Sequence, residues 1–272
     1  MTAINPARLK IQTAELGELV GQAEIFVPRL HEMLFFYSAR VRQTDLSTTL
    51  LTLRTYQVPE PVIQALEREI AERLEGDAEV GYSLADALWR ERWVEFRRLA
   101  VHVLGILPTE EPNRILRKIR DWLEKCNSEG IRRMILTEGM ARLASEKPDQ
   151  SIHFLEELIN SGSKESHQAA LFGLESFAKN PSYANLPVLF GLLSQILLRE
   201  EIGLVKEISA LLLALASRSE QEVTFFLIKQ LVPASKPRIY RVIRQVMRQL
   251  SPENQHLLHE KMESQIKLKT EN

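Results

Sequence analysis

A repeating pair of helices dominates the sequence from residue 96 onward. Equivalent amphipathic helices are predicted to begin at positions spaced 35, 35, 39 and 34 residues apart, namely Phe96, Ile131, Ser166, Val205 and Ile239. In each of them, mostly small or aliphatic side chains follow at steps of three and four residues, which gives a helix one apolar face. A partner helix fits after each start, over residues 114–125, 150–160, 186–199, 222–231 and 254–267. Such a unit cannot bury its apolar face alone, so the units are expected to stack into a solenoid.

The rest of the chain extends this all-α interpretation. Helices are predicted over residues 7–19, 22–41, 46–55, 62–74 and 82–90, and alternating strand patterns are absent. The predicted fold is a right-handed α-α superhelix. Its predicted parts are N-terminal helices that pack on or cap the solenoid (1–58), the repeat array (59–267) and a polar tail (268–272). An apolar run on the second helix is expected to be buried against the array, with an exposed docking patch as the alternative: Leu30, Met33, Leu34, Phe35, Phe36 and Tyr37.

Composition excludes several classes of protein. The net charge is −1, so any affinity for a polyanion must come from local clustering of cations. The single cysteine, Cys126, rules out an intrachain disulfide and a cysteine-rich zinc site, and is expected to be a small buried side chain. No signal-peptide pattern and no apolar run of membrane-spanning length occurs, so we expect a cytoplasmic protein without membrane contacts. We also expect a monomer.

Motifs for catalysis or for cofactors are absent. There is no glycine-rich phosphate loop and no His-Glu-x-x-His pattern, and we expect no cofactor. His256 and His259 are spaced for a metal but are more simply surface residues, so we assign no metal site. Trp89, Trp93 and Trp122 are interpreted as packing residues of apolar helices.

The repeat aligns basic residues along one surface. The position after each helix start holds Arg97, Arg132, His167, Lys206 and Tyr240, and the next holds Arg98, Arg133, Gln168, Glu207 and Arg241. The segment 223–252 has six basic residues and no acidic one, and Arg241, Arg244 and Arg248 fall on one helical face. Such a face suits a polyanion, because each neutralised phosphate releases counterions. A solvated basic stripe without function is the alternative.

Several segments together resemble the alkylation-repair DNA glycosylases built from HEAT-like repeats, the AlkD-like family. The resemblance runs from about residue 50 to about residue 250. It is carried by Tyr56-Gln-Val-Pro-Glu60, Ala87-Leu-Trp89, Glu95-Phe96, His167-Gln-Ala-Ala170, Val205-Lys-Glu-Ile208 and Leu231-Val-Pro-Ala-Ser-Lys236. The resemblance implies a concave basic surface that holds DNA, and a cleft where tryptophans and a carboxylate act on cationic alkylated purines.

The departures from the family pattern concern the chemistry. Where the resemblance implies a tryptophan and an aspartate in the second unit, this chain has Ser128 and Arg132. Gln168 replaces the family's arginine, and Ala210 replaces its later tryptophan. A guanidinium at position 132 would repel a developing cation, because it stays protonated. We therefore assign no catalytic residue, and expect a scaffold that has lost the chemistry.

Three functions stay open at this point. The first is a non-catalytic protein that binds duplex DNA through phosphate contacts, assigned to Arg97, Arg132, Arg133, Lys206, Lys236, Arg238, Arg241, Arg244 and Arg248. The second is an interaction scaffold that holds a protein or peptide in its groove. The third is an alkylpurine glycosylase with a rebuilt site, in which Glu129 or Glu138 supplies the carboxylate.

Overall fold

The computed structural model describes residues 5–38, 53–74, 76–198, 203–231 and 237–270. Within these ranges every regular element is an α-helix, apart from one isolated parallel bridge between Arg54 and Trp93. The chain divides into two compact units, Met1–Ser151 and Ile152–Asn272. The prediction of an all-α protein is confirmed.

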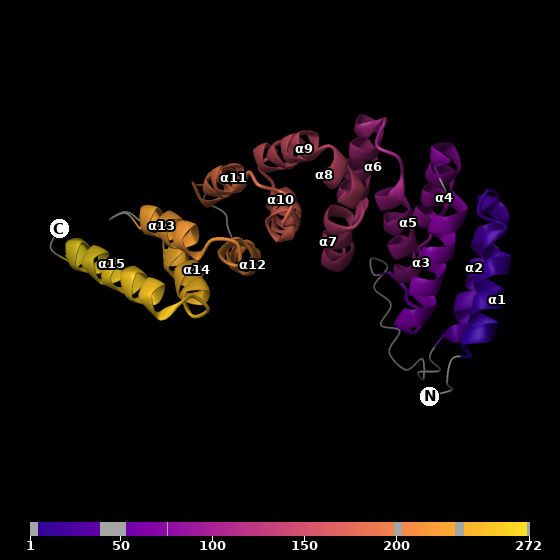
Figure 1. Cartoon of the computed structure of the whole chain (residues 1–272), viewed down its shortest axis with the longest axis horizontal. Coiled ribbons are helices and arrows are strands. Elements are labelled where there is room, and N and C mark those ends of the chain that lie inside the picture. The colour runs from indigo at the N-terminus through magenta and orange to yellow at the C-terminus, as the bar shows by residue number, and fades with distance from the viewer. Residues whose placement is uncertain (1–4, 39–52, 75, 199–202, 232–236, 271–272) are drawn as a thin grey trace. The chain divides into compact units, whose positions relative to one another are not determined.

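The first unit is built from two rows of helices. Its elements are α1 (Pro6–Gly17), α2 (Ala23–Tyr37), α3 (Glu60–Leu74), α4 (Ala78–Arg90), α5 (Val94–Ile106), α6 (Pro112–Lys125), α7 (Glu129–Thr137) and α8 (Ala141–Glu146). Helices α1, α3, α5 and α7 pack one on the next, while α2 packs on α4, α4 on α5, and α6 on α7 (Figure 1). The N-terminal pair α1–α2 thus packs on α3 and α4 as one more helix pair.

The second unit repeats this arrangement. Helix α9 (Pro148–Asn160) begins at the end of the first unit and continues into the second. It is followed by α10 (Lys164–Lys179), α11 (Leu186–Leu198), α12 (Val205–Ala216), α13 (Glu220–Gln230), α14 (Pro237–Met247) and α15 (Pro252–Thr270). Helix α12 packs between α10 and α14, while α13 packs on α12 and α15. Each unit is therefore a stack of HEAT-like helix pairs.

The predicted repeat is confirmed in its spacing. The five predicted starts fall in the first turn or two of α5, α7, α10, α12 and α14, and the five predicted partners correspond to α6, α9, α11, α13 and α15. Serine side chains help to set these starts, because the hydroxyls of Ser128, Ser163 and Ser219 accept hydrogen bonds from backbone N–H groups of α7, α10 and α13. Of the predicted helix over residues 46–55, the described residues 53–55 form no helix and the others lie outside the described part. The short helix α8 was not predicted.

The predicted burial of the apolar run on α2 is wrong in part. Leu30, Met33 and Leu34 are buried, but Phe35 and Phe36 are 72% and 52% exposed. Successive residues of an α-helix point about 100° apart, so a run of consecutive apolar residues cannot share one buried face.

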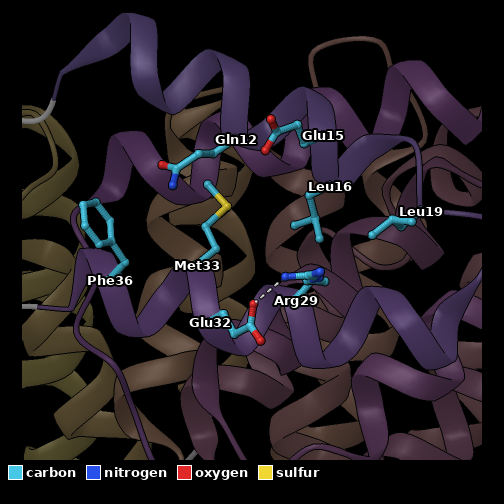
Figure 2. Close-up of a pocket in the computed structure, with 8 residues that line it drawn as sticks. All are labelled: Gln12, Glu15, Leu16, Leu19, Arg29, Glu32, Met33 and Phe36. Carbon is cyan, nitrogen blue, oxygen red and sulfur yellow. Dashed lines mark hydrogen bonds and ion pairs between the residues drawn. The ribbon is translucent and has the colours of Figure 1, made fainter.

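A pocket of about 460 Å³ lies between α1 and α2 (Figure 2). Its apolar lining comes from Leu16, Leu19, Met33 and Phe36, and its polar lining from Gln12, Glu15, Arg29 and Glu32. Figure 2 shows the ion pair of Arg29 with Glu32, 3.0 Å long, at the α2 side of the pocket.

Helix α5 comes close to the end of α7 at Gly105. A Cβ atom at this position would overlap the carbonyl oxygen of Glu138, which is backbone and has little freedom to move away. Gly105 is buried within α5, in the row that connects α3 to α7. The absence of a side chain is what lets the two backbones approach each other here.

A single arginine braces the loop between α10 and α11. The guanidinium of Arg218 donates to four carbonyl oxygens in the last turn of α10 and in this loop, at 2.9–3.4 Å: Ala178, Asn180, Pro181 and Tyr183. Arg218 itself lies just after α12, so the brace ties one helix pair to the preceding one.

Replacing Arg218 with alanine is expected to lower the free energy of unfolding by about 2–3 kcal/mol, because partly buried carbonyl groups would lose a charged donor. Urea unfolding followed by circular dichroism measures this loss. Arg248→Ala is the matched control, since Arg248 is exposed and should change stability by less than about 0.5 kcal/mol. Equal effects of the two substitutions would contradict the bracing role.

Candidate nucleic-acid interface

Helix α14 presents the basic stripe that the sequence predicts. Its apolar side is buried within the second unit through Val242, Ile243 and Val246. On the opposite side Arg241, Arg244 and, one residue past the helix end, Arg248 are exposed. Within the described part of the chain, none of these three guanidiniums forms an ion pair. Like charges three and four residues apart on a helix repel each other, so the stripe is a local concentration of uncompensated positive charge.

The other predicted contacts of the second unit are less defined. Lys206 is exposed in the first turn of α12, the helix that packs on α14. Lys236 lies outside the described residues, and of Arg238 only the backbone, in the first turn of α14, is described. Tyr240, next to the stripe in the sequence, is half-buried.

Two predicted contacts of the first unit make backbone hydrogen bonds. The Nε of Arg97 donates to the carbonyl oxygen of Glu91 at 2.9 Å, and the Nε of Arg132 donates to that of Cys126 at 2.8 Å. At the same repeat position, His167 Nε2 hydrogen-bonds a carbonyl oxygen in the last turn of α9 at 2.9 Å. Each side chain satisfies a carbonyl at or near the end of the preceding helix, where intrahelical partners run out. At three of the five repeats, the side chain at this position therefore has a structural role.

Arg97 is also held by aromatic rings. Its guanidinium lies 3.9 Å from the centre of the Trp89 ring, and Trp89 stacks on Trp122 with centres 4.1 Å apart. Trp89 and Trp122 are buried, as predicted, and so is Cys126. Burial lowers the pKa of Arg97, but a guanidinium remains charged at neutral pH. Arg133, on α7, is half-buried.

Arg98, the first residue of the second predicted row, is compensated by carboxylates. Arg98 forms ion pairs with Glu60 and Glu67 of α3, at 2.5 and 2.9 Å. The hydrogen bond from Arg98 lowers the pKa of Glu60. Partial burial raises the pKa of Glu138, although its side chain reaches solvent. Arg98 acts against this rise, and smaller effects of Glu67 and Glu60 add to it. This surface of the first unit holds more carboxylates than cations around Arg98.

We expect Glu138→Gln to stabilise the protein at pH 8 and to leave its stability unchanged at pH 4. Below the ordinary pKa of 4.5 the carboxyl is protonated in both the folded and the unfolded state. As the pH rises through the raised pKa, the folded wild type must ionise a disfavoured group, which the variant lacks. The difference should stay below about 1 kcal/mol because the carboxyl reaches solvent. Thermal midpoints at the two pH values measure it, and a difference that does not depend on pH would exclude this cause.

The positions that depart from the AlkD-like pattern lie on both units. Ser128 caps α7 in the first unit, where Arg132 makes the backbone contact described above. In the second unit, the amide of Gln168 donates to the buried carboxylate of Glu207 at 2.7 Å, and Ala210 is half-buried on α12. Gln168 thus links α10 to α12.

Trp93 departs from the packing role that the sequence suggested. It is the N-cap residue of α5 with an extended backbone, not part of a helix, and its ring is only half-buried. It stacks on Tyr56, with ring centres 3.9 Å apart and planes 9° apart. Trp93 precedes Ser128, the N-cap of α7, by one repeat of 35 residues. The apolar periodicity of α5 does not include position 93. This difference from Trp89 and Trp122 could have indicated that Trp93 is not a packing residue of a helix.

The described residues contain no group of three His, Cys, Asp or Glu side chains arranged to hold a metal ion. The Nδ1 atom of His259 lies 3.3 Å from Oε1 of Glu263, one turn further along α15. Among the described helices, none is both long and apolar enough to span a membrane.

Comparison with known proteins identifies the family. The family model described as DNA alkylation repair enzyme matches residues 52–259, which is most of the chain and includes both the Tyr56–Trp93 contact and the basic stripe of α14. No curated protein and no solved structure matches the chain. The extent of the family match agrees with the resemblance seen in the sequence, and the chain belongs to the DNA alkylation repair enzyme family.

Proposed function

We propose that this protein binds duplex DNA through the basic stripe of α14, without strong sequence preference. The observation that carries the proposal is the set of exposed, uncompensated guanidiniums of Arg241, Arg244 and Arg248 on one face of one helix. Arginines in such a row match the repeated phosphates of a nucleic acid backbone, and phosphate contacts carry no sequence information. Membership of a DNA alkylation repair family supports DNA as the polyanion.

The remaining predicted contacts are proposed separately for each unit. Lys206 lies on the neighbouring helix α12, and Lys236 and Arg238 immediately precede the stripe in the sequence. Arg97 and Arg132 each use Nε for a backbone carbonyl, which leaves their terminal nitrogens as donors to a phosphate. Arg133 completes the set proposed on the first unit.

We also propose that binding is not followed by removal of a base. Arg132 stands where the family resemblance implies a carboxylate, and its contact with the Cys126 carbonyl fixes a cation at this place. A fixed cation opposes the positive charge that develops on the sugar when a glycosidic bond breaks.

Both proposals are tested by incubating the protein with methylated and with unmethylated duplex DNA. Affinity is measured against salt, and free methylated purine is measured in the same samples. We expect dissociation constants of roughly 1–100 µM at physiological salt, a steep salt dependence and no released base. Release of 7-methylguanine or 3-methyladenine would overturn the second proposal and direct attention to Glu129 and Glu138. Absence of binding would overturn the first and leave a protein-binding scaffold as the best account.

A further inference from the structure

A short non-helical segment, residues 54–57, lies against the start of α5. The backbone N–H of Arg54 donates to the carbonyl of Arg92 at 2.9 Å, and the N–H of Val94 donates to the carbonyl of Arg54 at 2.8 Å. These two bonds form the isolated bridge between Arg54 and Trp93. They fix Arg54 beside residues 92–94, although these positions are far apart in the sequence.

A buried carboxylate holds the same segment in place. Glu95 is only 5% exposed, and its Oε1 accepts hydrogen bonds from the Thr55 hydroxyl at 2.7 Å and from the N–H groups of Tyr56 and Gln57, both at 2.9 Å. Gln57 has a φ of +53°, in the left-handed region that costs free energy for a residue with a side chain. Such a conformation persists only where its surroundings enforce it, and it is most frequent at functional sites. The segment is therefore held rigidly, at an energetic cost, on the surface of the first unit.

The rigid segment presents an aromatic platform, which we define as the stacked rings of Tyr56 and Trp93. His31 fixes the Tyr56 hydroxyl through Nδ1 at 2.7 Å, and its Nε2 lies 3.2 Å from the Glu91 carboxylate. Burial raises the pKa of Tyr56, with further contributions from Glu95 and Glu91, so the phenol is neutral at physiological pH. Both rings are half-buried, so part of the platform is open to solvent.

Two exposed arginines lie beside the platform. Arg54 and Arg92 are exposed, and neither forms an ion pair with another residue of the described part of the chain. The guanidinium of Arg54 is 5.9 Å from the centre of the Trp93 ring. Two carboxylates are also nearby and are turned toward hydrogen-bond donors, Glu91 toward His31 and the buried Glu95 toward the backbone N–H groups of residues 56–57. The ligand that suits this surface combines flat rings with anions.

We propose that the platform, together with Arg54 and Arg92, binds an unpaired nucleobase and its flanking phosphates in a single-stranded nucleic acid. An unpaired base exposes a π-face that stacks on aromatic side chains whatever its sequence, and arginines track the adjoining backbone. A duplex keeps its base faces covered. This site is therefore distinct from the phosphate-binding stripe proposed on α14, and it adds recognition of single strands to the proposed duplex binding.

Fluorescence anisotropy of a labelled short oligothymidylate, titrated with the full-length protein, tests the platform. Trp93→Ala should weaken binding about tenfold, since one stacked base is lost, whereas Trp93→Phe keeps a flat ring and should stay within about threefold of wild type. Phe35→Ala is the matched control, because Phe35 is an exposed aromatic residue on α2 of the same unit and should have no effect. Circular dichroism and the thermal midpoint show whether each variant is folded.

The arginines have a separate test. Arg54→Ala with Arg92→Ala should reduce the slope of log Kd against log salt by about 1.4 for the single strand, which corresponds to two lost phosphate contacts. Wild-type affinity in folded Trp93→Ala, an equal loss in Phe35→Ala, or an unchanged slope would overturn the proposal.

Repeating the Trp93→Ala comparison in a protein that also carries alanine at Arg241, Arg244 and Arg248 separates this site from the duplex-binding face. We expect the tenfold effect of Trp93 on single-strand binding to remain there. If it disappears, the platform is not a site of its own. Failure of duplex binding in the wild type, with the Trp93 effect intact, would instead overturn only the function proposed for α14.

Discussion

Replacing Arg241, Arg244 and Arg248 together with alanine will weaken duplex binding by roughly 10- to 100-fold at physiological salt and reduce the slope of log Kd against log salt by about 2.7. Each phosphate contact on duplex DNA contributes about 0.9 to this slope, and the three arginines are assigned one contact each. The stripe makes no ion pair within the described part of the chain, so its removal breaks no bridge and should leave the thermal midpoint unchanged or slightly raised. Fluorescence anisotropy at several salt concentrations measures both quantities.

The matched control removes the same charge elsewhere. Arg8, Lys10 and Arg29 are exposed on α1 and α2, and their replacement with alanine changes the net charge by the same amount. We expect this control to alter the slope by less than about 0.5, because surface charges that contact no phosphate are screened at physiological salt. A similar loss in both triple variants would mean that overall charge governs binding, and the assignment of the interface to α14 would then fail.

Gly105→Ala will lower the free energy of unfolding by about 3 kcal/mol, because the new Cβ meets the carbonyl oxygen of Glu138 and the backbones of α5 and the end of α7 must move apart. The control is Gly191→Ala in α11, where a Cβ meets nothing within 4 Å. That substitution should raise stability by about 0.5–1 kcal/mol, as alanine does in an open helical position. Urea unfolding of both variants gives the comparison, and a neutral or stabilising Gly105→Ala would show that the close approach is not required.

The periodic parts of the fold were predictable from the sequence. Apolar side chains at steps of three and four define the inner helices, and serines at positions 128, 163 and 219 begin helices, so both the repeat and its length follow from local rules. The prediction for α2 was wrong in part because it assigned a continuous apolar run to one buried face. In the structure, Phe35 and Phe36 of this run are exposed to solvent.

The role of individual cations was less accessible to sequence reasoning. Arg97, Arg132 and Arg241 were all assigned to phosphate contacts from the sequence, yet the first two bind carbonyl groups and the third is exposed. The difference depends on where the preceding helix ends and on which acceptors remain there, and neither is visible in residue spacing. The Tyr56–Trp93 platform was missed for a related reason. Its two rings come from segments nearly 40 residues apart, and the segment of Tyr56 has a left-handed backbone at Gln57, which residue spacing does not predict.

The side chains that bind carbonyl groups also affect how the array unfolds. In a solenoid, stability is divided between each repeat and its contacts with neighbours, and strong contacts between repeats make unfolding cooperative. Arg218 holds the loop of the preceding helix pair through four carbonyl groups, and Gln168 joins α10 to the buried Glu207 of α12. Because these bonds connect one repeat to the next, α12 cannot open without releasing the pair before it. We therefore expect the α10–α11 and α12–α13 pairs to unfold together and not one repeat at a time.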